Sequence, residues 1–125
     1  MALTVGLTGR AGLTVTEQDT AAALGSGDVA VLGTPRVVAL AEQASVAALD
    51  GHLADPYTSV GTRVEVDHRV PTPVGGTVQA EAQLVSVNGR KLAFAVVVRD
   101  EGAQTVAEGR IERVVVERTR FAGTA

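Results

Sequence analysis

The hydrophobic pattern of this chain divides near residue 59 into a helical part and a strand-forming part. The segment 34–51, TPRVVALAEQASVAALDG, carries apolar residues on nearly every side of a helix. Thr34 is a good N-cap, Pro35 suits the first helical position because it lacks an amide hydrogen, and Gly51 favours a left-handed stop. Since a surface helix carries a broad polar face, we expect this helix to be wrapped by other structure.

From residue 59 onward apolar and polar residues alternate, as in strands that bury one face. We expect strands over 59–70, 77–87 and 105–117, with a further strand around residues 92–98. In the first strand the inward face is predicted to hold Val60, Thr62, Val64, Val66, His68 and Val70. Asn88 and Gly89 are predicted to be the central residues of a type I′ hairpin turn, residues 100–102 a second turn, and Gly109 a bulge.

The N-terminal part carries weaker signals. Residues 3–8 and 11–15 read as short strands, a short helix starts near Thr16 and is closed by Gly25, and 118–125 reads as an edge extension or a loosely held tail. We therefore expect an α+β fold in one domain, residues 1–125, with one long helix against at least four antiparallel strands in a meander. One sheet of this size covers only one side of the helix, so we expect at least a dimer.

Composition excludes several kinds of site. The 125 residues have a net charge of −3, 2% aromatic residues and no cysteine. A nucleic-acid interface needs a basic stripe and stacking rings, and thiolate metal sites need cysteine. No segment approaches a membrane span or a signal peptide. We expect a cytoplasmic protein with no metal, no membrane contact and no nucleic-acid partner.

Two groups stand out for proton chemistry. His68 is predicted to face inward, where it is either a hydrogen-bonded structural histidine or a general base that exchanges protons near neutral pH. Glu42 marks either a narrow wet edge of the helix or a carboxylate kept in a partly enclosed site. His52, beside Gly51, is expected to be exposed.

Thr34 has two interpretations as well. It is either a helix cap or a hydroxyl presented to a site, with free amides at Arg36 and Val37 forming a weak anion site. Glu42 follows eight residues later, which on a regular helix is about 12 Å along the axis and about 80° around it. Thr34 and Glu42 would therefore meet only if the Thr34 loop folds back or a partner chain helps.

Three segments carry a family resemblance: LGTPRVVALAEQASVAAL (32–49), SVGTRVEVDHRVPTPVGGTV (59–78) and VNGRKLAFAVVVRDE (87–101). They resemble the hotdog-fold thioesterases related to fluoroacetyl-CoA thioesterase, over nearly the whole chain. The resemblance implies a hotdog fold, in which a curved antiparallel sheet wraps one central helix, and a homodimer, with dimers of dimers as a further option. It also implies a thioesterase with sites at the dimer interface that hydrolyses a small or medium acyl-CoA to free acid and CoA, without any other cofactor.

Carried over residue by residue, the resemblance makes Thr34, Glu42 and His68 the catalytic group. It places Gly61 where its backbone meets the thioester or the CoA arm, and makes Arg113 a ligand-holding residue. The fluoroacetyl-specific relative has phenylalanines before the helix, whereas 25–33 here has no aromatic residue, which predicts an open or aliphatic acyl pocket. Two other functions stay open: a non-catalytic module that binds acyl-CoA or another hydrophobic ligand, and enoyl-CoA hydration, which usually needs a carboxylate and a histidine on the same helix.

Overall fold

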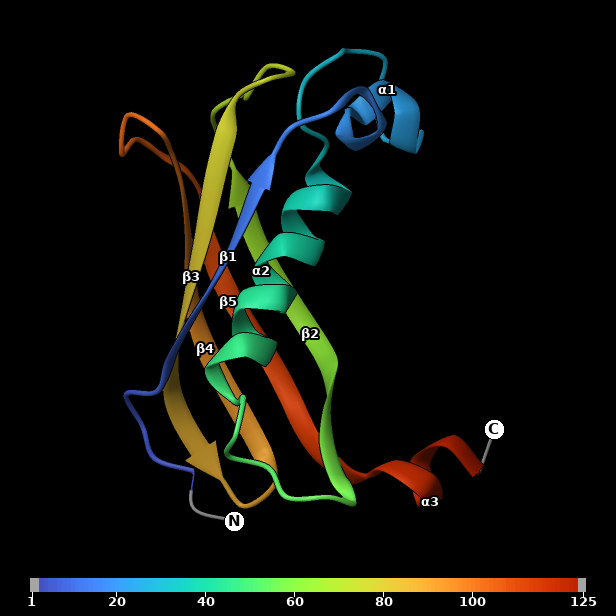
Figure 1. Ribbon diagram of the computed structural model, residues 1–125, viewed down its shortest axis with the longest axis vertical. Helices are drawn as coiled ribbons and strands as arrows, with labels where there is room; N and C mark the ends of the chain where they lie inside the picture. Colours follow the sequence, from blue (N-terminus) through green and yellow to red (C-terminus); the bar gives the residue numbers. More distant parts are fainter. Residues whose placement is uncertain (1–2, 124–125) are drawn as a thin grey trace.

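The computed structural model describes residues 3–123 and consists of one curved sheet, one long helix and short peripheral helices (Figure 1). In chain order the elements are β1 (Thr8–Thr14), η1 (Glu17–Asp19), α1 (Ala21–Leu24), α2 (Thr34–Ala48), β2 (Tyr57–His68), β3 (Thr77–Asn88), β4 (Lys91–Asp100), β5 (Thr105–Glu117) and α3 (Arg118–Gly123). The predicted long helix and the strands after residue 56 are thus confirmed, with the last strand at the expected bounds.

The five strands form one antiparallel sheet in the order β1-β3-β4-β5-β2. The predicted four-strand meander is wrong, because only β3, β4 and β5 follow one another across the sheet. The connection 69–76 leads away from β2, which lies at the edge beside β5, while β1 occupies the other edge beside β3. Alternation marks each strand in the sequence but carries no information about its neighbour.

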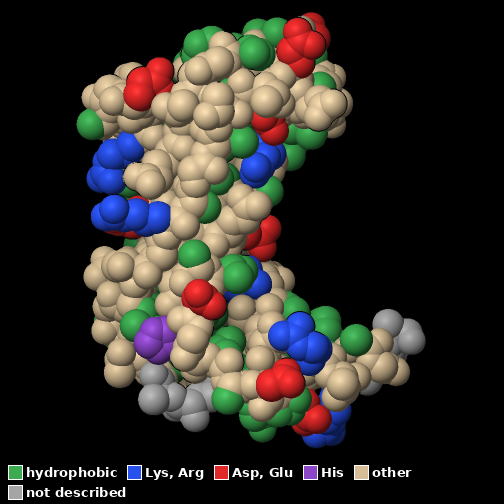
Figure 2. Space-filling model, in the orientation of Figure 1, with side chains coloured by type: hydrophobic (Ala, Val, Ile, Leu, Met, Phe, Trp, Pro, Cys, Tyr) green, Lys and Arg blue, Asp and Glu red, His purple; other side chains and the backbone are tan. Residues whose placement is uncertain are grey.

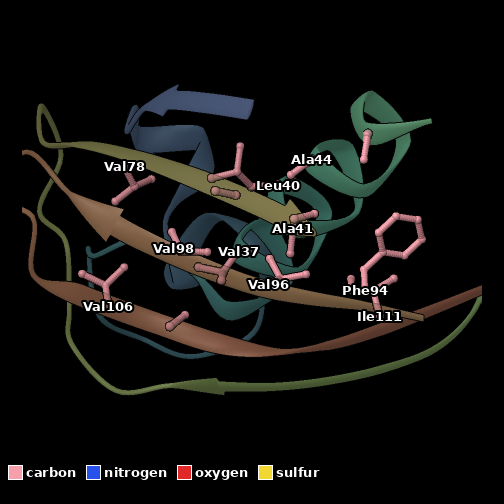
Figure 3. Packing of buried hydrophobic residues seen from close by; sticks show 14 of the residues in the cluster. Val37, Leu40, Ala41, Ala44, Val78, Phe94, Val96, Val98, Val106 and Ile111 are labelled. Atoms are coloured by element: carbon pink, nitrogen blue, oxygen red, sulfur yellow. The ribbon is translucent and has the colours of Figure 1, made fainter. Parts of the chain in front are cut away.

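Helix α2 lies across the concave face of the sheet (Figure 1). Its buried residues and the inward stripes of the strands form a single hydrophobic cluster, in which Figure 3 shows Val37, Leu40, Ala41 and Ala44 beside side chains of the sheet. The helix is covered on one side only, since Val46 on the opposite side is 50% exposed. The sequence argument for one-sided coverage is therefore confirmed.

Local corrections concern the turns and ends. The β3–β4 hairpin turns on Gly89 and Arg90, one residue later than predicted, and Gly89 has φ +60°. The bulge predicted at Gly109 is absent, because Gly109 pairs with Val66 without a register shift. A side chain at this position would overlap the backbone of Glu65, so only glycine fits. Of the two N-terminal strands predicted, 11–15 is found, up to Thr14, within β1, whereas the strand predicted at 3–8 is wrong, since residues 3–7 form a turn and irregular chain before Thr8. The helix predicted after Thr16 is divided into η1 and α1, and Gly25 ends it with φ +73°.

The C-terminal tail was predicted to be an edge extension or a loose segment, and that prediction is wrong for residues 118–123. They form α3, which projects from the end of β5 (Figure 1). Residues 124–125 of the predicted tail lie outside the described residues.

The close packing of β1 against α2 depends on Gly9. A Cβ at this position would overlap the helix backbone at Ala44, Ala47 and Ala48, which cannot move aside as a side chain can. We expect Gly9→Ala to lower the free energy of unfolding by about 3 kcal/mol, at the upper end of overpacking costs. Thermal unfolding measures this loss. Gly12→Ala on the same strand is the matched control, because its Cβ would lie 3.9 Å from the nearest atom, the carbonyl oxygen of Val78, and an equal loss in both variants would contradict the packing argument.

Candidate active site

Thr34 and His68 meet where α2 begins and β2 ends. Oγ1 of Thr34 lies 2.8 Å from Nδ1 of His68, within hydrogen-bond distance. The N-cap of α2 is Gly33, so the predicted cap role of Thr34 is wrong: Thr34 is the first helical residue and its hydroxyl is directed to the histidine. Of the two interpretations of Thr34, the structure supports a hydroxyl presented to a site.

The anion site predicted at the start of α2 is not formed. The amides of Arg36 and Val37 both donate to the carbonyl oxygen of Gly33, at 3.0 and 3.2 Å. An amide already engaged in this way has little capacity left for an anion. The chemistry at this end of the helix therefore rests on side chains.

His68 is half-buried and faces the helix, as its strand position predicted. Burial lowers its pKa below the ordinary value of 6.5, because the charged imidazolium loses hydration, and the backbone of Val70 partly opposes this shift. Nε2 is buried and has no hydrogen-bond partner among the described residues. His68 is therefore a neutral imidazole near pH 7 with Nδ1 on the Thr34 hydroxyl, and a neutral imidazole is what a general base requires.

A cavity of about 350 Å³ opens beside this pair. Its walls come from Thr34, from His68 and the residues after it, and from the connection between α1 and α2, with the lining residues Ala21, Ser26, Gly27, Asp28, Val29, Val31, Leu32, Arg69, Val70 and Pro71. The connection 25–33 therefore forms part of the wall over the Thr34–His68 pair. The side chains that this segment places on the wall are small, aliphatic or polar, and none is aromatic.

Glu42, Gly61 and Arg113 form a second cluster, near the middle of α2. The side chain of Arg113 is 7% exposed and its Nη1 lies 3.6 Å from Oε2 of Glu42, whose side chain is 37% exposed. A Cβ at Gly61 would overlap Oε2 of Glu42, so the glycine provides the space for the carboxylate. Burial lowers the pKa of Arg113 and the charge of Glu42 opposes that shift. Glu42 is therefore a partly enclosed carboxylate with a cationic neighbour.

Ser59 belongs to the same cluster, and sequence reasoning missed it. Its hydroxyl accepts a hydrogen bond from Nε of Arg113 at 2.9 Å, and its carbonyl oxygen accepts one from Nη2 at 3.1 Å. Strand parity had placed Ser59 and Gly61 on the outer face, which is wrong because the register shifts between Gly61 and Arg63. The extra residue, Thr62, turns the two halves of β2 so that Ser59 and Gly61 face the helix as His68 does.

The two clusters do not meet within one chain. No hydrogen bond or ion pair in residues 3–123 joins Glu42 to Thr34 or His68, and the cavity beside Glu42 is a separate one, lined by Ala39, Glu42, Gln43, Val46 and Arg113. Because α2 is helical from Thr34 itself, the alternative in which the Thr34 loop folds back to Glu42 is excluded. The other alternative, in which a partner chain brings a Glu42 side chain to the Thr34–His68 pair, remains.

Other candidate features contribute little. His52 is exposed, as predicted. Among the described residues no three His, Asp or Glu side chains are grouped to hold a metal ion, and no helix of residues 3–123 is long and apolar enough to cross a membrane. Figure 2 shows basic and acidic side chains interspersed on the visible face, without a continuous basic area.

Comparison with known proteins gives consistent matches. A sequence model of the family described as fluoroacetyl-CoA-specific thioesterase (FlK) matches residues 15–119. The fluoroacetyl-CoA thioesterase of Streptantibioticus cattleyicolor is 37% identical over 91 residues, and this match spans 73% of the chain but only 65%, less than two thirds, of that enzyme.

Solved structures agree with this match. A structure of the fluoroacetyl-CoA thioesterase FlK is 32% identical, with a TM-score of 0.88 and coverage of 99% of this chain and 96% of that one. A hot-dog-like protein from Thermanaerovibrio acidaminovorans is 27% identical, with a TM-score of 0.86 and coverage of 96% and 88%. The hotdog fold expected from the sequence, a curved antiparallel sheet around one long helix, is confirmed.

Proposed function

The chain belongs to the fluoroacetyl-CoA-specific thioesterase family, and from this premise we propose that it is an acyl-CoA thioesterase that hydrolyses a small or medium acyl-CoA to the free acid and CoA. The observation that carries the proposal is the hydrogen bond between Thr34 and His68 at the wall of a cavity. A neutral histidine paired with a hydroxyl is an arrangement that activates a nucleophile for acyl transfer.

His68 acts as the base in this proposal. When the Thr34 hydroxyl donates to Nδ1, His68 takes the proton of Thr34 as the hydroxyl attacks the thioester carbonyl. When Nδ1–H donates to Thr34 instead, Nε2 holds the lone pair and takes the proton of an attacking water that enters beside it. If Thr34 attacks, the CoA thiolate leaves with the proton held by His68 and the acyl group stays on Oγ1 of Thr34 as an ester, which a water deprotonated by His68 then hydrolyses to the free acid. If water attacks directly, the CoA thiolate leaves and the free acid forms in one displacement.

Glu42 completes the site from a second copy of the chain. Within one chain Glu42 and its neighbours Gly61 and Arg113 are separated from His68, and Val46 beside them on α2 is an apolar side chain left 50% exposed. Strand β2 is an edge strand with one unpaired side, a natural place for a second copy to pair. In the homodimer proposed here, the Glu42 carboxylate either attacks the thioester, which expels the CoA thiolate and leaves an enzyme-bound anhydride that water hydrolyses, or orients the attacking water. Gly61 and Arg113 lie beside the substrate.

The acyl group is proposed to be small or medium and aliphatic. Residues 26–29, 31 and 32 supply aliphatic side chains, the Ser26 hydroxyl and the Asp28 carboxylate to the cavity beside Thr34 and His68. Such a wall offers no ring for the acyl group to stack on, and it leaves room for a short alkyl chain. The Streptantibioticus cattleyicolor enzyme and FlK are thioesterases of fluoroacetyl-CoA, whereas the panel of esters described next identifies the acyl group of this chain.

Thiol release from a panel of CoA esters, from acetyl through medium-chain and phenylacetyl, tests the proposal. We expect turnover of at least one aliphatic ester, with phenylacetyl-CoA turned over more slowly, because the cavity wall contributed by residues 26–32 has no aromatic group. Isothermal titration with the same esters is the companion measurement. Binding of esters without thiol release would contradict the proposal and support a non-catalytic acyl-CoA binding module.

A further inference from the structure

The guanidinium of Arg113 is oriented by Ser59 more than by any other residue. Nε donates to the Ser59 hydroxyl and Nη2 donates to the Ser59 carbonyl oxygen, so one residue accepts from two of the three guanidinium nitrogens. The third nitrogen, Nη1, is then directed to Glu42. The side chain of Arg113 is 7% exposed, so water has little access to replace a lost hydrogen bond.

The carboxylate of Glu42 is confined by the same group of residues. Its Oε2 rests against Gly61 and faces Nη1 of Arg113 at 3.6 Å. At that separation the contact is an ion pair and not a short hydrogen bond. The direction of Nη1 therefore decides where the electrostatic attraction holds the carboxylate, and Ser59 sets that direction.

We propose that Ser59 is a positioning residue of the active site, which fixes Arg113 and through it the Glu42 carboxylate. This inference rests on the function proposed above. It gives Arg113 a role different from the one implied by the family resemblance: two of its three nitrogens are committed to Ser59 and the third to Glu42, so its main task is to orient the carboxylate. Ser59 acts at a distance from the substrate and contributes no proton.

A matched pair of substitutions isolates the hydroxyl. Ser59→Thr keeps it, whereas Ser59→Val has nearly the same shape as threonine and lacks it, and both residues suit a strand. We expect Ser59→Thr to keep activity within about threefold of wild type. Ser59→Val should lose roughly tenfold or more in kcat, the scale of one hydrogen bond to a charged group. KM should stay unchanged in both variants, since Ser59 does not touch the substrate.

A second readout follows Arg113 directly. The Nε–H of Arg113 should give a protected NMR signal in wild type and in Ser59→Thr, and exchange rapidly with water in Ser59→Val. Arg113→Lys lacks the Nε–H donor, so the difference between the threonine and valine variants should disappear in that background. Thermal unfolding checks that all variants are folded.

The outcomes separate the two proposals. Equal kcat in Ser59→Val and Ser59→Thr would overturn the positioning role, and so would a protected Nε–H signal in Ser59→Val. The positioning role is supported if Ser59→Val loses both kcat and the protected Nε–H signal of Arg113 while KM stays constant. If wild type released no thiol from any ester, the proposed function would fail, and the NMR comparison alone would decide whether Ser59 holds Arg113.

Discussion

Glu42→Gln is expected to lose most of the thiol-releasing activity while the protein stays folded and keeps its assembly state. Glutamine fills the same space over Gly61 but carries no charge, so it can neither attack a thioester nor accept a proton from water. A group that acts as nucleophile or base contributes about 10²–10⁴-fold, and we expect a loss in kcat within that range. Steady-state thiol release measures it.

Two controls make this result interpretable. Glu17→Gln removes a carboxylate from an exposed position in η1, and it should keep wild-type activity. Size-exclusion chromatography and thermal unfolding of Glu42→Gln should match wild type, because the side chain is one-third exposed and its neutral form leaves the Arg113–Ser59 hydrogen bonds in place. An active Glu42→Gln protein would remove Glu42 from the catalytic group.

The sequence was sufficient for most of the architecture because the dominant signals are local. The apolar segment after Thr34 and the alternation after residue 58 report directly which faces are buried. The predicted strands at 77–87 and 92–98 are found as β3 and β4, and their inward residues Val78, Leu84, Phe94 and Val98 lie in the core. The pairing of β2 with β5 was missed, since a strand's partner is chosen by the whole sheet and not by the strand.

The candidate site was predictable to a lesser degree. His68 faces the helix as parity required, but the same parity failed for Ser59 and Gly61 because of the register shift at Thr62. A bulge adds one residue without any strong sequence signal, and it reverses the face of every residue on one side of it. The only hint in the sequence was Gly61, a residue that strands seldom hold without a close approach.

Thr34 shows how a correct local signal can hide a function. Threonine before proline at a helix start is a strong cap pattern, yet Gly33 precedes it and serves as the N-cap. The Thr34 hydroxyl is therefore not used as a cap and instead forms a hydrogen bond with His68, 34 residues later in sequence. The spacing between Thr34 and Glu42 carried more information, because it already indicated that the two groups do not meet along a regular helix within one chain.

His68→Ala should reduce kcat by about 10²–10⁴-fold, and it should also remove the acidic limb of the pH–rate profile. His68 works as a base only when neutral, and burial places its pKa below 6.5. Wild-type activity should therefore fall as the pH falls through a midpoint below 6.5. Folding also disfavours protonation of His68, because its pKa is lower in the folded state than in the unfolded state. The contribution of neutral His68 to the free energy of unfolding is therefore fully present above pH 6.5 and decreases as the pH falls below 6.5. Rate and unfolding measurements between pH 5 and pH 8 record both effects.

His52→Ala is the matched control, since His52 is exposed in the loop after α2 and its substitution should leave the rate and the pH–rate profile unchanged.

Thr34→Val then decides which group His68 activates. A loss as large as that of His68→Ala would make the Thr34 hydroxyl the nucleophile, whereas a loss of about tenfold or less would mean that His68 activates water and Thr34 only orients the ring. An acidic limb centred above 6.5, or full activity in His68→Ala, would contradict the role of His68 as the base, because a solvated histidine or an unrelated group would then set the rate.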